Sequence, residues 1–206
     1  MAFVRAQQKS TDDHSGEADA GRVSLLLDLN HDSPTTRRWA ARDLCRFPDV
    51  AAAMVTRLKR ETDLSVREVI LTTLTRIGDS QAVSGLVDCL RSEDAALRNE
   101  AIEAMQRLPI EVGPLMQGLL KDTDTDVRIF AVNILESLRH PDVEAWLIDV
   151  VETDSHVNVC AAAVDLLSEI GTPAAYTALL ALKARFRDEP YIEFATDLSL
   201  RRIDEK

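Results

Sequence analysis

Apolar residues recur along this chain at spacings of three and four, and the pattern repeats about every 30 residues. Its anchor positions are Arg37, Arg67, Arg98, Arg128, Cys160 and Glu193. The residues one before, three after, seven after and ten after each anchor are nearly all apolar. The set seven after the anchors is Leu44, Leu74, Met105, Leu135, Leu167 and Leu200. These offsets lie on one face of an α-helix, so the pattern predicts a series of equivalent amphipathic helices.

The predicted helices have readable beginnings and ends. Four residues before the first four anchors stand Ser33, Asp63, Asp94 and Asp124. Their side-chain oxygens can accept hydrogen bonds from the free backbone N–H groups of a helix start. Helix stops are indicated at Pro48, Gly78, Pro109 and Gly171, with the two glycines read as left-handed C-caps. Between each stop and the next start lies a second apolar segment, such as "SQAVSGLVDCL", so the repeating unit is a helical hairpin.

The chain divides into six such hairpins after a polar N-terminal segment. Their predicted ranges are 22–48, 49–78, 79–109, 110–140, 141–171 and 172–206. Residues 1–21 are polar and are predicted to be disordered. One hairpin of this length cannot bury its apolar face alone, so neighbours must stack and share a continuous core. The predicted fold is all-α, a right-handed α-solenoid of the armadillo-like superhelix type.

Two stretches carry a family resemblance. "DTDTDVRIFAVNILESL" and "DSHVNVCAAAVDLLSEIGTPAAYTALLAL" resemble HEAT repeats, with the D-x-D-x-x-V-R-x-x-A pattern of the short bacterial type that is also seen in phycobilin-lyase-like proteins. The resemblance covers about 180 residues. It is specific for the fold and unspecific for activity, because such repeats serve as binding scaffolds in unrelated settings.

The resemblance implies a role for the anchor arginine, which ties the turn inside a hairpin, often through an acidic residue six positions before an anchor. Pairing each anchor with the next unit predicts four contacts: Arg37 with Glu61, Arg67 with Ser92, Arg98 with Asp122, and Arg128 with Asp154. The same rule places Cys160 opposite Arg187, which would also face Glu193. Two hypotheses follow for Cys160: a small apolar filler where the ladder of ion pairs ends, or a redox-active thiol whose pKa Arg187 lowers.

Charge and composition narrow the function classes. The net charge of -11 disfavours nucleic acid as a partner. A DNA-binding HEAT-like glycosylase would need a basic face, which Glu68, Glu103 and Glu136 oppose. The chain has no apolar run of membrane-spanning length and no secretory signal, so a cytoplasmic protein without membrane contact is expected. Its three cysteines are widely spaced and predict reduced thiols.

Few residues suggest chemistry. None of the four histidines forms an H-x-x-x-H or H-E-x-x-H motif, and the glycines form no nucleotide-binding loop. The acidic "DTDTD" segment is interpreted as a turn with helix caps in preference to a calcium loop. The sequence therefore predicts no catalytic residue, no metal and no cofactor. The principal hypothesis is a non-enzymatic adaptor or regulatory scaffold that binds another protein. The alternative is a phycobilin-lyase-like HEAT subunit that handles a chromophore on a partner protein.

The expected contact surface is the solvent stripe of the second helices, which usually line the concave side of a HEAT-type solenoid. The candidate contact residues are Arg38, Trp39, Arg42, Arg46, Glu68, Glu103, Arg107, Phe130, Asn133 and Glu136. The segment "TRRWAARDL" is the strongest candidate, because Arg and Trp often dominate interface energies. The alternative is a capping repeat in which Trp39 packs on the first helix. Trp146, in contrast, is predicted to lie in the core.

Overall fold

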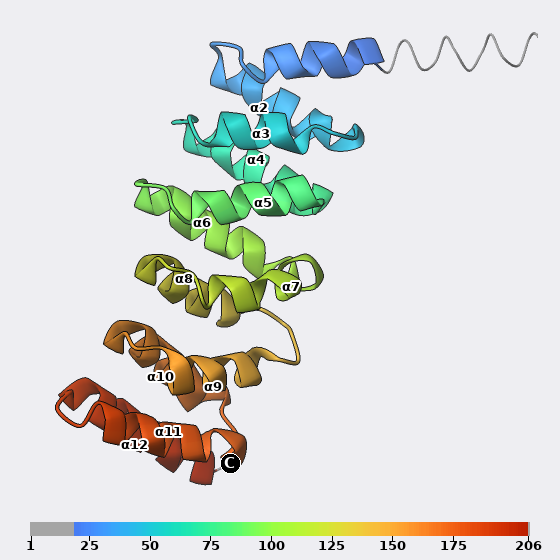
Figure 1. Cartoon of the computed structure of the whole chain (residues 1–206). Helices are drawn as coiled ribbons and strands as arrows, with labels where there is room; N and C mark the ends of the chain where they lie inside the picture. Colours follow the sequence, from blue (N-terminus) through green and yellow to red (C-terminus); the bar gives the residue numbers. More distant parts are fainter. Residues whose placement is uncertain (1–18, 206) are drawn as a thin grey trace, which may run out of the picture. The chain divides into compact units, whose positions relative to one another are not determined.

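The computed structural model describes residues 19–205, and every regular element in that range is a helix (Figure 1). The chain contacts divide it into two compact units, one ending at Cys89 and the other beginning at Leu90. The division falls inside the third predicted hairpin. Residues 1–18 of the predicted N-terminal tail lie outside the described residues, whereas residues 19–21 already belong to the first helix.

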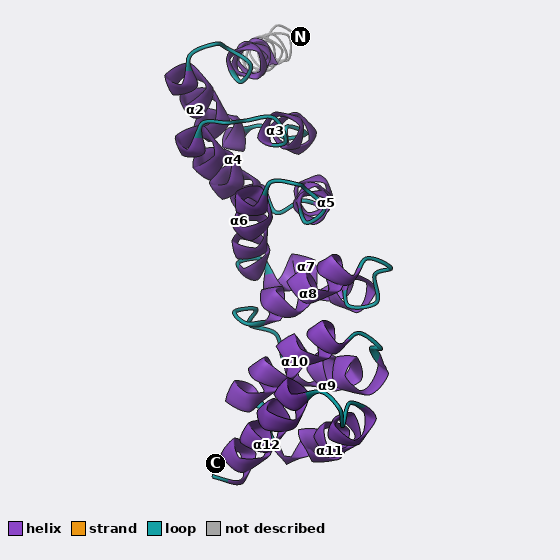
Figure 2. Ribbon diagram, turned by 90° about the vertical axis from the view of Figure 1, so that its left-hand side faces the viewer, coloured by secondary structure: helices purple, strands orange, loops and turns teal. Residues whose placement is uncertain are grey.

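The first unit is a two-layered stack of helices (Figure 2). Its elements are a helix at 19–28, α2 (Pro34–Asp43), the 3₁₀ helix η1 (Leu44–Arg46), α3 (Ala51–Leu58), α4 (Leu64–Ile77) and α5 (Ser80–Cys89). Helices α2 and α4 pack against each other in one layer, and α3 and α5 pack against each other in the other. Helix α4 also contacts α3 and α5, so the layers share one core.

The second unit has the same two-layered construction. Its elements are α6 (Ala95–Gln106), α7 (Pro109–Leu119), α8 (Thr125–Leu135), α9 (Val143–Thr153), α10 (Val157–Ile170), η2 (Pro173–Ala175), α11 (Tyr176–Arg185) and α12 (Pro190–Asp204). Helices α6, α8, α10 and α12 contact one another in sequence, and α9 contacts α11. The anchored second helices therefore form one layer, and the first helices form the other.

The predicted helix starts are confirmed. Asp63, Asp94 and Asp124 each accept a hydrogen bond from the backbone of the first turn, and Ser33 accepts one from Thr36. The two predicted glycine caps differ. Gly78 is left-handed, with φ of 59°, as expected for a glycine C-cap. Gly171 has φ of -58° and ψ of 147°, so the prediction of a left-handed cap there is wrong: the chain leaves α10 in an extended conformation.

The repeated apolar positions form the core. Leu74, Met105 and Leu167 are fully buried, and Leu135 is 2% exposed. Trp146 is 8% exposed, which confirms its prediction as a core residue. Ile170 departs from the pattern, with 41% of its surface exposed. It is the last residue of α10, where the helix ends and no further turn covers it.

Candidate functional site

The predicted contact segment of the first unit forms an exposed arginine and tryptophan cluster on α2. Trp39 is 48% exposed. The guanidinium carbon of Arg42 lies 4.0 Å from the centroid of a Trp39 ring, and that of Arg38 lies 5.9 Å from it. Such cation–π contacts hold the tryptophan at the surface with positive charge around it. With half of its surface exposed, Trp39 is not fully packed on the first helix, and whether the cluster contacts a partner stays a prediction.

One acidic residue moderates this positive charge. Asp43 accepts a 2.8 Å hydrogen bond from Arg42 Nε, and its other carboxylate oxygen lies 3.4 Å from an Arg46 nitrogen. The hydrogen bond from Arg42 lowers the pKa of Asp43. Arg38 has no acidic partner within ion-pair distance among residues 19–205.

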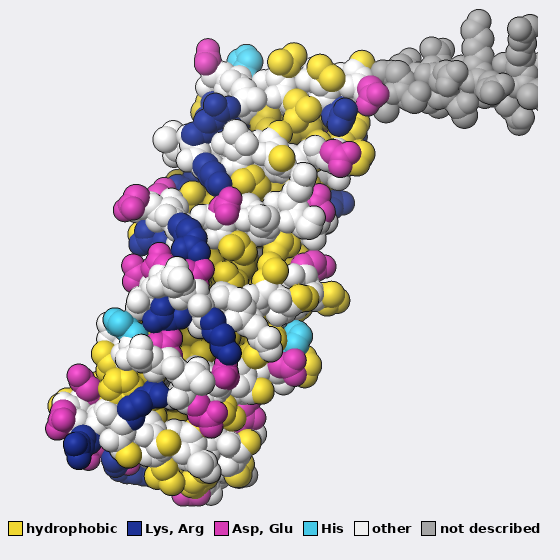
Figure 3. All heavy atoms as spheres, in the orientation of Figure 1, with side chains coloured by type: hydrophobic (Ala, Val, Ile, Leu, Met, Phe, Trp, Pro, Cys, Tyr) yellow, Lys and Arg dark blue, Asp and Glu magenta, His cyan; other side chains and the backbone are white. Residues whose placement is uncertain are grey.

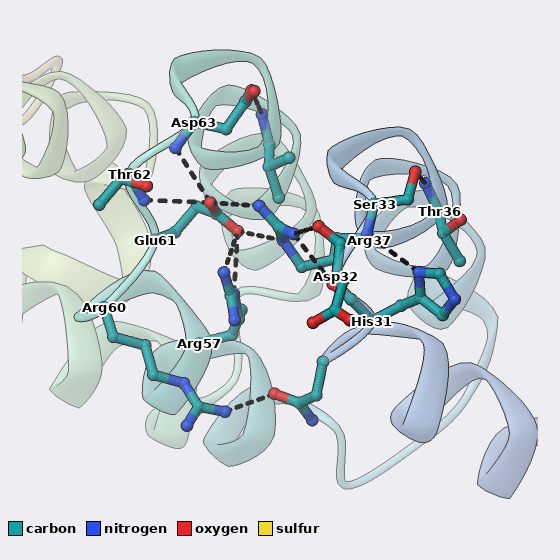
Figure 4. A network of polar contacts seen from close by, with 12 residues as sticks. His31, Asp32, Ser33, Thr36, Arg37, Arg57, Arg60, Glu61, Thr62 and Asp63 are labelled. Carbon is teal, nitrogen blue, oxygen red and sulfur yellow. Dashed lines mark hydrogen bonds and ion pairs between the residues drawn. The ribbon is translucent and has the colours of Figure 1, made fainter.

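The buried ion pair of Arg37 with Glu61 fixes the rotation of α2 (Figure 4). Arg37 donates from Nε and Nη2 to the two carboxylate oxygens of Glu61, at 2.7 and 2.8 Å. Its Nη1 donates to the carbonyl oxygens of His31 and Asp32 in the preceding turn. This confirms the predicted pair of Arg37 with Glu61. Because Arg37 is held on the inner face, the side chains of Arg38 and Trp39 must point outward.

Glu61 is the centre of this network. Burial raises the pKa of Glu61, but hydrogen bonds from Arg37, from the Asp63 backbone and from Arg57 outweigh it and hold the pKa at about 2. The side chain is completely shielded from solvent. An ionised carboxylate in such a position is tolerated only with several donors around it, and Glu61 has them from two guanidinium groups and two backbone N–H groups.

The anchors of the second unit confirm one predicted pair and correct another. Arg128 donates from Nε to Asp154 at 2.7 Å, as predicted. Arg98 does not pair with Asp122: it donates to the Ser92 carbonyl and lies 5.5 Å over the Phe130 ring. Asp122 instead forms an ion pair with Arg91, which lies in the turn between α5 and α6.

Cys160 is buried and contacts Arg185, not the predicted Arg187. Its thiol donates to the carbonyl oxygen of Asp154 at 3.4 Å, and Arg185 Nη2 lies 3.4 Å from the sulfur. Burial raises the pKa of Cys160, and the opposing effect of Arg185 does not overcome it. Burial likewise raises the pKa of Cys89 to about 11. The geometry therefore supports the filler hypothesis for Cys160 and gives no support to a reactive thiol.

The predicted contact of Glu193 with Arg187 is also corrected. Glu193 lies 3.9 Å from Lys183. The reason is local: α11 carries Lys183 towards α12, where it also pairs with Asp197, while Arg187 lies exposed in the turn after α11.

Four predicted contact residues line two surface hollows of the second unit. The first hollow, of about 240 Å³, lies between α8 and α10 and contains Asn133 and Glu136 together with Asp165 and Glu169. The second, of about 620 Å³, lies at the end of α6 and contains Glu103 and Arg107. Each hollow is thus a local depression beside the exposed face of a second helix.

The remaining candidates lie elsewhere. Glu68 is exposed on α4, Arg46 is exposed in η1, and Phe130 is half-buried under Arg98. Two residues of these surfaces were not predicted. Tyr191 donates from its hydroxyl to Asp165 at 2.7 Å, and Arg139 lines the second hollow. Arg139 follows the last apolar position of its repeat and so falls outside the helical stripe that the periodicity defines.

Within the described part of the chain, no three His, Cys, Asp or Glu side chains lie close enough together to hold a metal ion. No helix between residues 19 and 205 combines the length and the apolar character needed to cross a bilayer.

Comparison with known families supports the interpretation of the repeats. The family model described as HEAT repeats matches residues 23–106 and 112–192. This match bears out the predicted fold class, an all-α solenoid of HEAT-like hairpins.

The curated relatives include two proteins named bilin biosynthesis protein PecE. The protein of Mastigocladus laminosus is 31% identical over 153 residues, which are 71% of this chain and 56% of the relative. The protein of Nostoc sp. is 33% identical over 88 residues, which are 39% of this chain and 35% of the relative. The chain therefore spans about half or less of the length of the curated relatives it matches.

Similar solved structures include natural and designed helical repeats. The complex of CpcE and CpcF of phycocyanin lyase from Nostoc sp. PCC7120 is 19% identical, with a TM-score of 0.35 over 88% of this chain and 92% of that one. A designed armadillo repeat protein in complex with the peptide (KR)4 is 18% identical, with a TM-score of 0.43 over 87% of this chain and 98% of that one.

These relatives correct one prediction. The sequence led us to expect a protein without any enzymatic role, and that prediction is wrong, because the curated relatives are named for bilin biosynthesis. The error has a plain origin: HEAT-type repeats show no catalytic motif whether or not the assembly in which they work carries out a reaction.

Proposed function

We propose, from the premise that this chain belongs to the HEAT-repeat family, that it is a phycobilin-lyase-like subunit that handles an open-chain tetrapyrrole on a partner protein. One observation carries the proposal: 31% identity to a bilin biosynthesis protein across 153 residues. The matched segment covers 71% of this chain, so the likeness extends over several repeats.

The partner protein is held, in this proposal, by the exposed faces of the second helices. On the first unit the contact is the cluster of Arg38, Trp39 and Arg42, which combines positive charge with a half-exposed aromatic ring. On the second unit it is the acidic hollow between α8 and α10, with Glu136 on its wall. The two surfaces differ in sign, so each favours a partner surface of the opposite charge.

In this proposal the chain contributes binding and positioning to the reaction. Cys89 and Cys160 are buried thiols with raised pKa values, so neither is suited to form a bond with a pigment, whereas Cys45 in η1 is half-buried. The contact faces instead suit holding the pigment and the partner protein close together. Such proximity alone can strongly accelerate the reaction between them.

The test is a pigment-transfer assay. The purified chain is mixed with a phycobilin and an apo-phycobiliprotein subunit, with and without a second HEAT-type lyase subunit, and covalently attached pigment is followed by fluorescence after denaturing electrophoresis. We expect attachment to be faster with the chain in at least one arm, and the pigment's absorbance spectrum to change on mixing with the chain alone.

The control is Arg187→Ala, which alters an exposed residue outside the proposed contact faces and should behave as the wild type. A wild-type chain that neither changes the pigment spectrum nor accelerates attachment in either arm contradicts the proposed function.

A further inference from the structure

Two surface hollows adjoin at the ends of α6 and α8. The hollow of about 620 Å³ is lined by Arg107 and Arg139 among others. Another hollow, of about 610 Å³, lies beside α7. Pro109 and Arg139 line both hollows, so the two hollows adjoin at these residues. Each volume lies within the roughly 300–1,000 Å³ typical of small-molecule sites.

The hollow of about 620 Å³ at the end of α6 carries positive charge that has no partner among the described residues. Arg107 and Arg139 are both exposed, and neither side chain has a hydrogen bond or ion pair to any residue of the described range 19–205. Most other arginines between residues 19 and 205 are engaged with carboxylates or carbonyls, as Arg37 and Arg128 are. Glu103 lines this hollow and Asp142 lines the adjoining one, and both oppose an anion. Arg107 lines only the hollow that contains Glu103, whereas Asp142 lies beside His140, 3.9 Å from its Nδ1 atom.

The hollow of about 610 Å³ beside α7 has an apolar and aromatic wall. The rings of His140 and Trp146 are stacked, with centroids 4.6 Å apart and planes inclined by 21°. His140 lies directly on the backbone of α7, because a Cβ atom at Gly113 would be only 3.0 Å from its ring. Ile110, on the same wall, is 82% exposed, an unusual position for a large aliphatic side chain in water. In the space-filling view, hydrophobic side chains reach the surface around α7 (Figure 3).

We propose that these adjoining hollows bind a conjugated molecule that carries carboxylate groups, with its carboxylates on Arg107 and Arg139 and its ring system along Ile110 and His140, whose ring is backed by the buried Trp146. Guanidinium groups suit this task because they bind carboxylates with two parallel hydrogen bonds. The inference rests on the proposed function for the identity of the ligand, an open-chain tetrapyrrole acid, and it adds the place where that ligand is held.

The experiment uses biliverdin as the probe, titrated into the full chain and followed by its absorbance and induced circular dichroism. The double variant Arg107→Ala plus Arg139→Ala should bind the free acid at least about tenfold more weakly, because two charge-assisted contacts are lost. Biliverdin dimethyl ester lacks the negative charges, so its affinity should be the same for the wild type and the double variant.

Two further variants separate this site from alternatives. Ile110→Ser should weaken binding of both the acid and the ester, since it removes apolar contact without disturbing a buried position. Glu103→Gln should tighten binding of the acid alone. Arg38→Ala plus Arg42→Ala removes the same number of charges from the other exposed arginine cluster and should leave the affinity unchanged.

The outcomes distinguish the two proposals. If the wild type binds biliverdin and the Arg107 and Arg139 variant binds it equally well, or if the Arg38 and Arg42 variant is the one that loses it, the site assigned here is wrong and the proposed function stands. If the wild type binds no pigment and accelerates no attachment, both are wrong.

Discussion

The Nη2 atom of Arg185 lies 3.4 Å from the Sγ atom of Cys160, and both groups donate to the carbonyl oxygen of Asp154. Elsewhere the anchor arginine itself donates to the carbonyl six residues before it, as Arg37 does to His31 and Arg128 does to Asp122. Cys160 keeps this contact with a weak donor, and Arg185 adds a charged one from the neighbouring helix. The anchor's role is thus divided between two residues of successive hairpins.

This division predicts that Arg185 stabilises the fold although it is exposed. Its guanidinium also donates to the carbonyls of Val151 and Glu152 at the end of α9. Arg185→Met should lower the free energy of unfolding by about 1–2 kcal/mol in a urea titration, because three backbone acceptors lose a charged donor. Arg187→Met, two residues away and exposed, is the control and should change it by less than about 0.5 kcal/mol. Equal effects of the two substitutions would refute this division of roles.

Glu61 should make stability depend on acid. Its folded-state pKa of about 2 is below its ordinary value of 4.5. A depressed pKa stabilises the fold above the unfolded value, and this contribution is lost as the pH falls from about 4.5 towards 2. The loss should approach 3 kcal/mol, at about 1.4 kcal/mol for each pKa unit.

The measurement is the free energy of unfolding at pH 7, 4 and 2.5 for the wild type and Glu61→Gln. The difference between them should shrink as the pH falls, because the wild type loses what the variant already lacks. Asp88→Asn removes one partner of the exposed Lys59–Asp88 pair and should show almost no such effect. A constant difference between wild type and Glu61→Gln across this range would contradict the assignment.

The sequence predicted the repeats well because periodicity reports burial directly. The seventh-position residues Leu74, Met105 and Leu167 are all fully buried, and the aspartate caps are where the pattern placed them. The ion pairs were less predictable. The pairing rule found Arg37 with Glu61 but failed at Arg98, because long side chains choose among several acceptors within reach and Arg91 competes for Asp122.

The candidate site was predicted only where it follows the helix stripe. Asn133 and Glu136 share a hollow as their spacing suggested, since both lie on the outer face of α8 and its end. Arg139, His140 and Trp146 come together through the link between α8 and α9, and no periodicity describes a link. Their proximity depends on how the chain turns there, which the pattern of apolar residues does not encode.

The space around two helical glycines, Gly85 of the first unit and Gly118 of the second, predicts opposite effects of alanine substitution. A Cβ atom at Gly85 would lie 2.1 Å from a methyl group of Val55, a branched side chain with little freedom to move. Gly85→Ala should therefore destabilise the protein by about 1–3 kcal/mol through overpacking. A Cβ atom at Gly118 would meet nothing within 4 Å, so Gly118→Ala should stabilise it by about 0.5–1 kcal/mol through its helix propensity. Thermal unfolding measures both, and a shift of the same sign in the two variants would contradict the packing argument.

The two contact faces predict distinct effects of charge reversal on partner binding. Arg38→Glu plus Arg42→Glu removes the positive charge around Trp39, and Glu103→Lys plus Glu136→Lys reverses the acids of the second-unit hollows. All four side chains are exposed, so the helical circular dichroism should be unchanged.

Binding to an apo-phycobiliprotein subunit, measured by interferometry at two salt concentrations, should weaken about tenfold or more in at least one variant, mainly through slower association at low salt. Arg187→Glu, in the exposed turn after α11 and outside the proposed faces, is the control for charge change. Equal affinity of the wild type and both test variants would exclude these stripes as the contact surface and direct attention to the outer faces of the first helices.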